Sequence, residues 1–309
     1  MDCSDLKSIP LIDISPLVEK IDDPDMSNDK NLLHVVQMLD DACKDVGFFY
    51  VKGHGISESL MIEVRDVVRK FFQLPYEEKI KIKMTPQSGY RCLTPITPGR
   101  YGDLGKTLEG HNLWPEDPSN AKALIENYIG LLKDLSRKIM RGIALALGGP
   151  VDALEGATAG DPFWACRLLG YPIATEVPEE KRTDTGMGSH TDFGLLTLVN
   201  QDNDMCALEV QNHSNEWIDA RPIPGTFVCN IGDMLEVWSN GIYQPTVHRA
   251  INNSPSFRVS IAFFYETNFD TAIEPVAFCK EKTGGTAKYN SIIYGERLAR
   301  KACCCFGNA

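Results

Sequence analysis

The spacing of hydrophobic positions changes along the chain, and this change indicates how the protein is organised. Up to about residue 150, apolar residues recur every three or four positions, which is the period of an amphipathic helix. The pattern predicts three helices, at about 29–46, 57–74 and 120–147. Asn28 or Asp29 can cap the first helix, and Gly47 ends it. Two short aromatic or β-branched runs predict strands, at 9–14 and 47–56.

From about residue 160 the pattern changes to short strands separated by turns that contain Asn, Asp, Gly and Pro. The predicted strands lie at 163–171, 195–199, 207–210, 226–231, 246–251 and 257–265. Short strands at this spacing indicate a β-barrel or a double-sheet jelly roll. We therefore expect a mainly β fold with flanking α-helices, the helices coming first in the chain and the barrel second.

The composition narrows the classes of function. The 309 residues are 43% hydrophobic and 24% charged, as in ordinary globular proteins. A formal charge of −11 repels nucleic-acid phosphates and anionic lipids, so we expect neither nucleic acid nor a membrane as a partner. The chain starts without a signal-peptide pattern and its ten cysteines form no C-x-x-C pair, which favours a cytoplasmic location. Cys303–Cys305 stand in a tail that we interpret as frayed, with palmitoylation as the alternative.

A candidate metal site lies in the stretch GSHTDFGLLTLV, from Gly188 to Val199. His190 and Asp192 are two residues apart beside a predicted strand, where residues i and i+2 share a face. Two histidines and one carboxylate that leave positions open suit a non-haem Fe(II) oxygenase. Alone, a His-x-Asp pair is weak evidence, because a hydrogen-bonded pair at a strand end is the ordinary alternative.

A third ligand and an anion site come from later strands. His248, in TVHRAI, is the best remaining histidine, because a returning strand can bring it beside the first pair. Arg258 and Ser260 share one face of a strand, and an arginine inside a barrel needs an anion. Its fork matches a carboxylate, which favours an acid cosubstrate, with an internal ion pair as the alternative. We expect turn, capping or solvated roles for the other histidines, His34, His54, His111 and His213.

His190-x-Asp192, His248 and Arg258-x-Ser260 together resemble the signature of the plant 2-oxoglutarate- and Fe(II)-dependent dioxygenases, within the isopenicillin N synthase-like oxygenase superfamily. The resemblance spans nearly the whole chain, from IPLIDIS and GFFYVKGHGI to FVCNIGDMLEVWSNGIYQPTVHRA. It implies a double-stranded β-helix (jelly-roll) core with flanking helices. The N-terminal region, 1–118, would pack on a core at 119–309 that includes the long helix.

The same resemblance implies roles for individual residues. The implied iron ligands are His190, Asp192 and His248. Arg258 and Ser260 would hold the distal carboxylate of 2-oxoglutarate, together with Tyr171 of LLGYP. The asparagine often found two residues before this tyrosine is Leu169 here, so one cosubstrate contact is missing or replaced. Asp192 itself argues against the halogenating variants, which carry a small residue at that position.

The implied activity is hydroxylation or desaturation of a small plant metabolite or hormone. It would be coupled to the oxidative decarboxylation of 2-oxoglutarate to succinate and CO2, with O2 as the oxidant and ascorbate as the reductant. Three alternatives stay open: an oxidase on the same scaffold that does not need 2-oxoglutarate, a catalytically weak metal-binding relative, and a zinc hydrolase. We expect a monomer.

Two further features concern the substrate. The stretch GYRCLTPITPGRYGDLGK, within which residues 89–105 read as a loop, looks shortened beside relatives that carry a longer pocket segment. It predicts an unusual substrate or inefficient turnover. Phe163, Phe193 and Trp238 are candidates for an aromatic substrate wall, with packing in the core as the alternative for each.

Overall fold

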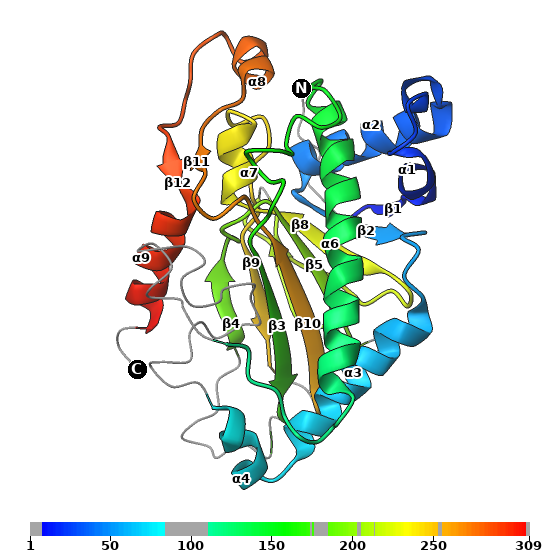
Figure 1. Ribbon diagram of the computed structural model, residues 1–309, viewed down its shortest axis with the longest axis vertical. Coiled ribbons are helices and arrows are strands. Elements are labelled where there is room, and N and C mark those ends of the chain that lie inside the picture. Colours follow the sequence, from blue (N-terminus) through cyan, green and yellow to red (C-terminus); the bar gives the residue numbers. More distant parts are fainter. Residues whose placement is uncertain are drawn as a thin grey trace.

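The computed structural model describes residues 8–83, 111–173, 175, 185–202, 205–212, 214–252 and 255–306. Two β-sheets form its centre (Figure 1). The larger sheet contains, in spatial order, β1 (Leu11–Asp13), β2 (Phe48–Lys52), β8 (Phe227–Ile231), β5 (Leu196–Gln201), β10 (Arg258–Tyr265) and β3 (Trp164–Tyr171). The smaller sheet contains β4 (Thr185–His190), β9 (His248–Ile251), β6 (Leu208–Gln211) and β7 (Trp217–Asp219). This is the predicted mainly β fold, a jelly roll of the double-stranded β-helix type.

Strand pairing in both sheets is antiparallel except between β1 and β2. A short third pair joins β11 (Ala272–Ile273) to β12 (Ile292–Ile293). Within the described residues the α-helices are α1 (Ser15–Lys20), α2 (Lys30–Asp45), α3 (Glu58–Gln73), α4 (Tyr76–Lys79), α6 (Ala121–Ala146), α7 (Asp233–Trp238), α8 (Ala277–Lys282) and α9 (Tyr294–Phe306). No helix in the described part of the chain is long and apolar enough to cross a bilayer.

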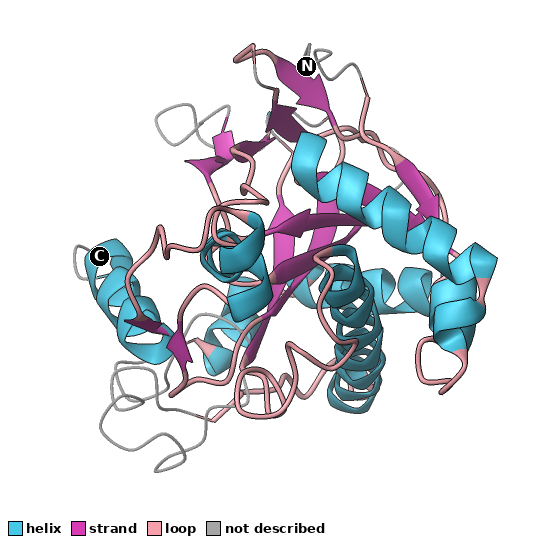
Figure 2. Cartoon of the chain, turned by 90° about the horizontal axis from the view of Figure 1, so that it is seen from above, coloured by secondary structure: helices cyan, strands magenta, loops and turns pink. Residues whose placement is uncertain are grey.

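The three long predicted helices are confirmed, and side-chain capping fixes the starts of the first two, α2 and α3. The Asp29 carboxylate accepts hydrogen bonds from the backbone N–H groups of Asn31 and Leu32, at 2.9 and 3.0 Å, which fixes the start of α2. The Ser57 hydroxyl caps α3 through the N–H of Leu60 at 3.3 Å. These helices lie outside the sheets (Figures 1 and 2).

A continuous hydrophobic core fills the space between the long helices and the outer face of the larger sheet. It includes Leu39 of α2, Val64 of α3, Leu132 of α6 and Phe263 of β10, all nearly inaccessible to solvent. The helices cover one face of this sheet, so its other face can enclose a cavity with the smaller sheet. The boundary between 118 and 119 stays a prediction.

Several observed helices and strands were not predicted from the sequence. They include the short strands β4 and β7 and the helices α1, α7 and α9, for which the sequence predicted no regular element. The prediction that the C-terminal tail is frayed is wrong for the backbone, because α9 runs from Tyr294 to Phe306. This helix buries Tyr294 and Leu298 in the core. α7 has no amphipathic pattern because nearly all of its side chains are buried.

Candidate active site

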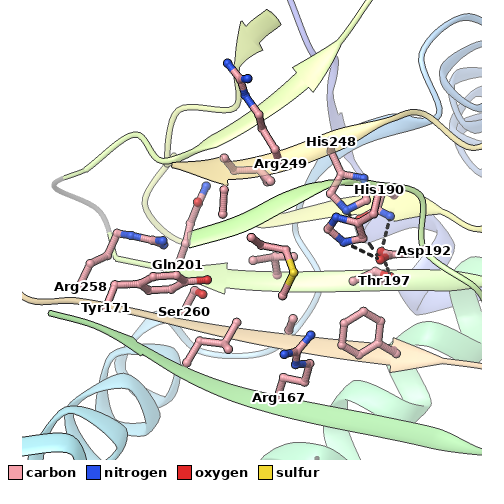
Figure 3. A pocket seen from close by; sticks show the side chains of 18 residues that line it. Arg167, Tyr171, His190, Asp192, Thr197, Gln201, His248, Arg249, Arg258 and Ser260 are labelled. Carbon is pink, nitrogen blue, oxygen red and sulfur yellow. Dashed lines mark hydrogen bonds and ion pairs between the residues drawn. The ribbon is translucent and has the colours of Figure 1, made fainter. Parts of the chain in front are cut away.

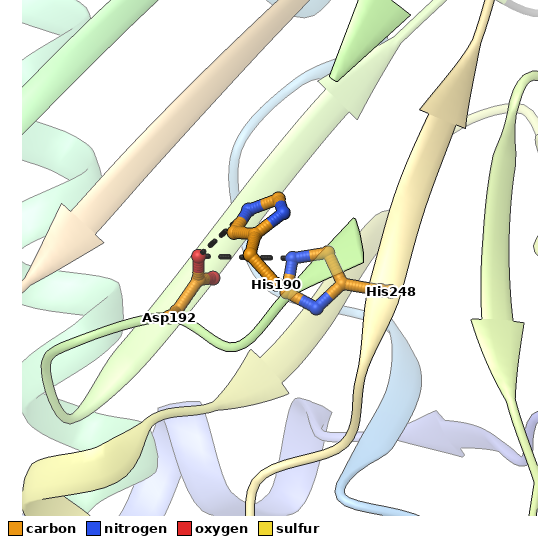
Figure 4. Close-up of side chains that lie close together, drawn as sticks. All are labelled: His190, Asp192 and His248. Carbon is orange, nitrogen blue, oxygen red and sulfur yellow. Dashed lines mark ion pairs between the residues drawn. The ribbon is translucent and has the colours of Figure 1, made fainter. Parts of the chain in front are cut away.

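His190, Asp192 and His248 lie close together at the end of β4 and the start of β9 (Figure 4). His190 ends β4 and lies directly opposite His248, the first residue of β9, so the ring centroids are 4.3 Å apart. The Asp192 Oδ1 atom lies 3.6 Å from Nε2 of His190 and 3.7 Å from Nε2 of His248. One ligand atom from each residue falls within 4.8 Å of the others.

The way in which His190 and Asp192 come together differs from the sequence argument. They do not share a strand face, because β4 ends at His190 and Asp192 lies in the connection to β5. Pairing of β4 with β9 positions His190, and the connection then turns the Asp192 carboxylate back towards both imidazoles. Spacing alone could not show this, because β4 is a glycine-containing strand that the hydrophobic pattern misses.

Hydrogen bonds orient each of the three side chains. The Asp192 Oδ2 atom accepts from Thr197 Oγ1 at 2.5 Å and from Asn230 Nδ2 at 2.6 Å, which leaves Oδ1 to face the two imidazoles. Thr197 and Asn230 are cross-strand partners on β5 and β8, so both side chains reach the same face. No spacing in the sequence singles out either residue.

The imidazoles are fixed in the same way. Nδ1 of His190 lies 2.7 Å from the carbonyl oxygen of Gly188, and Nδ1 of His248 lies 3.1 Å from that of Thr246. A carbonyl can only accept, so each Nδ1 carries the proton and each Nε2 offers its lone pair to the centre. Burial lowers the pKa of His190, and the neighbouring His248 lowers it further, which favours the neutral imidazole that binds a metal.

This donor set fits a ferrous ion. Two imidazole nitrogens and one carboxylate oxygen converge from one side, and the cavity occupies the other. A 2-His-1-carboxylate set with open positions is the arrangement of non-haem Fe(II) oxygenases.

Thr197→Val is expected to lower the affinity for Fe(II) by about 10- to 100-fold, the usual effect of losing a hydrogen bond that orients a metal ligand. The substitution keeps the shape of the side chain and frees Oδ2 of Asp192 to rotate. Titration of metal-free protein with Fe(II) under anaerobic conditions measures the effect. Thr226→Val, which removes a hydroxyl bonded to the Ile223 carbonyl far from the ligands, is the matched control. Equal affinities in the two variants would contradict an orienting role for Thr197.

A cavity extends from the three ligands between the two sheets (Figure 3). Arg258 lies at its far end, opposite Tyr171 of β3, with the guanidinium carbon 3.7 Å from the centroid of the Tyr171 ring. The Arg258 side chain is buried, and its Nε and Nη2 atoms have no hydrogen-bond partner among the described residues. Leaving a buried cation unpaired is costly, so this guanidinium is positioned to receive an anionic ligand. The alternative of an internal ion pair has no support among the described carboxylates.

Ser260 lies on the same face of β10 as Arg258 and also lines the cavity. Its cross-strand neighbours are Leu169 on β3 and Gln201 on β5. Leu169, which replaces the expected asparagine, therefore faces the cavity without an amide. Gln201 supplies an amide to the same row from the opposite side, and its Nε2 donates to the Ala220 carbonyl at 3.2 Å. The Gln201 side-chain oxygen is thus a candidate for the missing polar contact, which the sequence argument did not identify.

A pair of charged residues holds the backbone on both sides of Arg258. Arg69 of α3 donates to the Phe257 carbonyl at 3.0 Å and to Asp202 Oδ1 at 2.7 Å. Asp202 Oδ2 accepts from the N–H of Val259 at 2.7 Å. The start of β10 is therefore anchored to the helical layer, and Arg258 is presented to the cavity from a fixed backbone.

Asp202→Asn is expected to raise the KM for 2-oxoglutarate by about tenfold with little change in kcat, because a lost charge-assisted hydrogen bond costs about 1.5–3 kcal/mol and here loosens only the Arg258 backbone. Steady-state assays with varied 2-oxoglutarate measure this split. Asp219→Asn, which breaks an exposed ion pair with Arg221, is the control. A lower melting temperature with an unchanged KM would show that Asp202 acts on stability alone.

The three aromatic candidates for the substrate wall lie elsewhere. Phe163 is buried against Phe269 and Tyr294, with ring centroids 5.5 and 6.0 Å apart, and Trp238 is buried in the same core. Phe193 packs against this core from its edge. None of them lines the described cavity. The side chains that do so beyond the proposed ligands include Arg167, Met187, Leu208 and Phe264. Arg167 and Phe264 could have been found by extending the alternation of β3 and β10 from Tyr171 and Arg258.

The remaining sequence predictions fall on polar or terminal residues. His54 is buried and structural, because its Nε2 lies 3.0 Å from the Gly225 carbonyl and its Nδ1 accepts from the N–H of Ile56 at 3.2 Å. His34 and His111 are exposed. His213 and the stretch 89–105 lie outside the described residues, and so do the side chains of Cys303–Cys305.

Glu266 is a buried acid beside the ligand loop. Burial raises its pKa to about 8, and the charge of Asp192 adds to the effect. Its carboxylate occupies the space in which a side chain at Gly194 would stand, since an added Cβ there would overlap Oε2. The Glu266 Oε2 atom has no hydrogen-bond partner among the described residues. In the folded protein this carboxyl group is therefore mostly protonated at neutral pH.

The free energy of unfolding of the metal-free protein is expected to carry a pH dependence that Glu266→Gln removes. The unfolded chain loses the Glu266 proton above about pH 4.5, whereas the folded chain keeps it up to about pH 8, so this group lowers stability as pH rises between the two values. At pH 8.5 the free energy of unfolding of the glutamine variant should exceed that of the parent by a few kcal/mol, whereas near pH 4 the two values should be similar. Urea unfolding at both pH values measures this. A constant difference would contradict the raised pKa.

The jelly roll, the converging donor set and a buried guanidinium with no anionic partner among the described residues define an iron- and 2-oxoglutarate-dependent oxygenase. Residues 9–127 match the family described as non-haem dioxygenase in morphine synthesis N-terminal, and residues 163–267 match the 2OG-Fe(II) oxygenase superfamily. The chain belongs to the 2OG-Fe(II) oxygenase superfamily, which confirms the predicted resemblance.

Full-length relatives give the same result. The chain is 70% identical to the rice protein homoarginine-6-hydroxylase 2-ODD-233, over 96% of this chain and 97% of that protein. It is 54% identical to the Arabidopsis thaliana homoarginine-6-hydroxylase 2-ODD-C23.1, with the same coverage. The alignment with the rice protein is 319 positions long and includes 96% of the 309 residues of this chain, or about 297 residues. About 22 positions of the alignment are therefore gaps in this chain. That count is consistent with a shortened segment.

The fold also resembles solved structures whose sequences are less similar to this chain. A full-length Neurospora crassa protein in complex with alpha-KG superposes with a TM-score of 0.78 at 28% identity and covers 95% of each chain. JOX2 in complex with 2OG, Fe and JA gives a TM-score of 0.73 at 29% identity, over 94% of this chain and 84% of that one. The protein is thus a 2-oxoglutarate-dependent hydroxylase that uses Fe(II) and acts on a small molecule, as the sequence predicted.

Proposed function

We propose that this protein hydroxylates homoarginine at C6. The observation that carries the proposal is the 70% identity to the rice homoarginine-6-hydroxylase over nearly the full length of both chains. Within this proposal His190, Asp192 and His248 bind Fe(II), and Arg258, Ser260 and Tyr171 bind the distal carboxylate of 2-oxoglutarate. A monomer in the cytoplasm stays part of the proposal.

The chain's own residues have defined tasks in this reaction. The two imidazole Nε2 atoms and Asp192 Oδ1 occupy one side of the metal position and leave the side towards the cavity open. Thr197 and Asn230 keep the carboxylate in one orientation through Oδ2. When bound, Fe(II) with 2-oxoglutarate supplies the oxidation, in which O2 is consumed, 2-oxoglutarate becomes succinate and CO2, and a substrate C–H becomes C–OH.

Arg258 fixes the cosubstrate. Its guanidinium offers two parallel N–H donors to a carboxylate, and the Ser260 hydroxyl on the same strand face adds a third. The Tyr171 ring covers one face of the guanidinium, which holds its plane in one orientation and limits access of water. A dicarboxylate held at Arg258 would lie in the cavity that leads to the three ligands.

The test is an assay of the purified protein with Fe(II), 2-oxoglutarate, O2 and ascorbate. Homoarginine should be consumed with one succinate formed per molecule, and arginine and lysine should be consumed more slowly. Succinate formation that homoarginine does not stimulate would overturn the proposal. The ratio of succinate to consumed homoarginine also tests the shortened segment, because a ratio well above one would show the inefficient coupling that its sequence predicts.

A further inference from the structure

Arg167 is a second arginine that points into the cavity. It lies in the middle of β3, opposite Ala262 of β10, and its side chain projects between the sheets with those of Leu169 and Tyr171 (Figure 3). The side chain is half-buried, and no described carboxylate pairs with its guanidinium. A cation that faces a mostly apolar cavity in this way is available to a ligand.

The charges that line the cavity indicate what this ligand must carry. The described charged side chains there are Arg167, Arg249, Arg258 and Asp192. Arg249 is already paired, because its Nε lies 2.6 Å from Glu209 Oε2 and its guanidinium covers the Trp217 ring at 4.0 Å. The charges of Fe(II), Asp192, Arg258 and doubly ionised 2-oxoglutarate cancel. Among the described residues, the charge of Arg167 therefore has no counterion once metal and cosubstrate are bound.

The strand register separates Arg167 from the cosubstrate anchor. Arg258 and Ala262, the partner of Arg167, are four residues apart on β10, which corresponds to about 14 Å along the strand. In the other direction, the row of Phe264 and Thr197 is only two residues, or about 7 Å, from the row of Arg167. Thr197 bonds directly to Asp192, so Arg167 lies towards the metal end of the cavity. Figure 3 shows the two side chains in separate parts of the cavity, with the Arg258 guanidinium beside the Tyr171 ring. The two arginines therefore form two anion sites.

We infer that Arg167 binds the carboxylate of the substrate and thereby selects carboxylic acids, such as an α-amino acid, over their neutral or decarboxylated analogues. This inference rests on the proposed function. A guanidinium fork accommodates both carboxylate oxygens, and it repels the guanidinium at the other end of homoarginine. The substrate is thus held in one direction, with its carboxylate at Arg167 and its far end free to reach the metal.

The test compares homoarginine with its carboxamide and with the decarboxylated analogue 5-guanidinopentylamine. Binding is measured calorimetrically on full-length protein loaded with Mn(II) and 2-oxoglutarate under anaerobic conditions, so the readout does not depend on turnover. The parent should bind homoarginine at least tenfold more tightly than either analogue. Arg167→Met should weaken the binding of homoarginine by about 10- to 100-fold, as expected for loss of a charge-assisted pair, and should leave the affinities for the two analogues unchanged. The affinity of Arg167→Lys for homoarginine should lie between those of the parent and Arg167→Met. Arg221→Met, at an exposed arginine, is the control.

Each outcome has one reading. If Arg167→Met weakens all three ligands equally, the side chain acts through packing and the inference is overturned. If Arg167→Met weakens the binding of 2-oxoglutarate instead, Arg167 belongs to the cosubstrate site and the inference is also overturned. If the parent consumes homoarginine but the preference for the acid survives in Arg167→Met, the proposed function stands and only this inference falls. If the parent neither binds nor consumes homoarginine, the proposed function falls and this inference falls with it.

Discussion

Asp192→Ala should reduce turnover by more than about 100-fold, the upper range for loss of a residue that merely supports a metal ligand. The substitution removes the only carboxylate of the described donor set and leaves two imidazoles to hold the ion. It also leaves Thr197 and Asn230 without their acceptor, so part of the orienting network is lost as well. Fe(II) affinity, measured by anaerobic titration, should fall in parallel with succinate formation.

Thr197→Val provides the graded comparison for this experiment. Affinity for Fe(II) should decrease in the order parent, Thr197→Val, Asp192→Ala, because the first substitution only loosens the ligand that the second removes. Treatment of the parent with a chelator should reproduce the loss of activity, and added Fe(II) should restore it. Full metal affinity in Asp192→Ala would exclude the carboxylate as a ligand, whatever happened to turnover.

Arg258→Met should weaken 2-oxoglutarate binding by about 100-fold or more, because removing one partner of a buried charge pair costs about 2–5 kcal/mol. The affinity for the metal should stay unchanged, since the three ligands lie at the other end of the cavity. Arg258→Lys should have a smaller effect, because it keeps the charge and loses the two-pronged geometry. Calorimetry with 2-oxoglutarate on Mn(II)-loaded protein measures both variants.

The same substitution should increase the stability of the ligand-free protein. Arg258 is buried, and two of its nitrogen atoms have no partner in the part of the chain that the structure describes, so its charge is a cost in the absence of an anion. Methionine removes that cost while keeping most of the side-chain volume. A higher urea midpoint together with weaker cosubstrate binding would establish that this position trades stability for binding. An unchanged dissociation constant for 2-oxoglutarate would show that the anion binds elsewhere.

The fold was predictable where local signals are strong. α2 begins at Asp29 and α3 at Ser57 because their side chains satisfy free backbone N–H groups, and such signals are readable in the sequence. β4 was not predictable, because Thr185–His190 contains two glycines and becomes a strand only by pairing with β9. α7 was missed for the opposite reason, since a helix buried on all sides has no polar face to reveal its period.

The candidate site divides in the same way. The sequence by itself determined which side chains can take part: a His-x-Asp pair, a later histidine, and an arginine and a serine that alternate onto one strand face. Alternation along a strand is a local property, so Arg258 and Ser260 could be placed together in advance. The aromatic residues Phe163 and Trp238 could not be assigned, because packing in a core and lining a pocket require the same residue types.

Only the tertiary structure decided which of these side chains meet. The pairing of β4 with β9 sets His190 against His248, the turn after β4 returns Asp192 to both, and the pairing of β3 with β10 exposes Arg167 to the same cavity. These contacts join residues far apart in the chain. Their register depends on how whole sheets pair and pack, which no single segment of the sequence specifies.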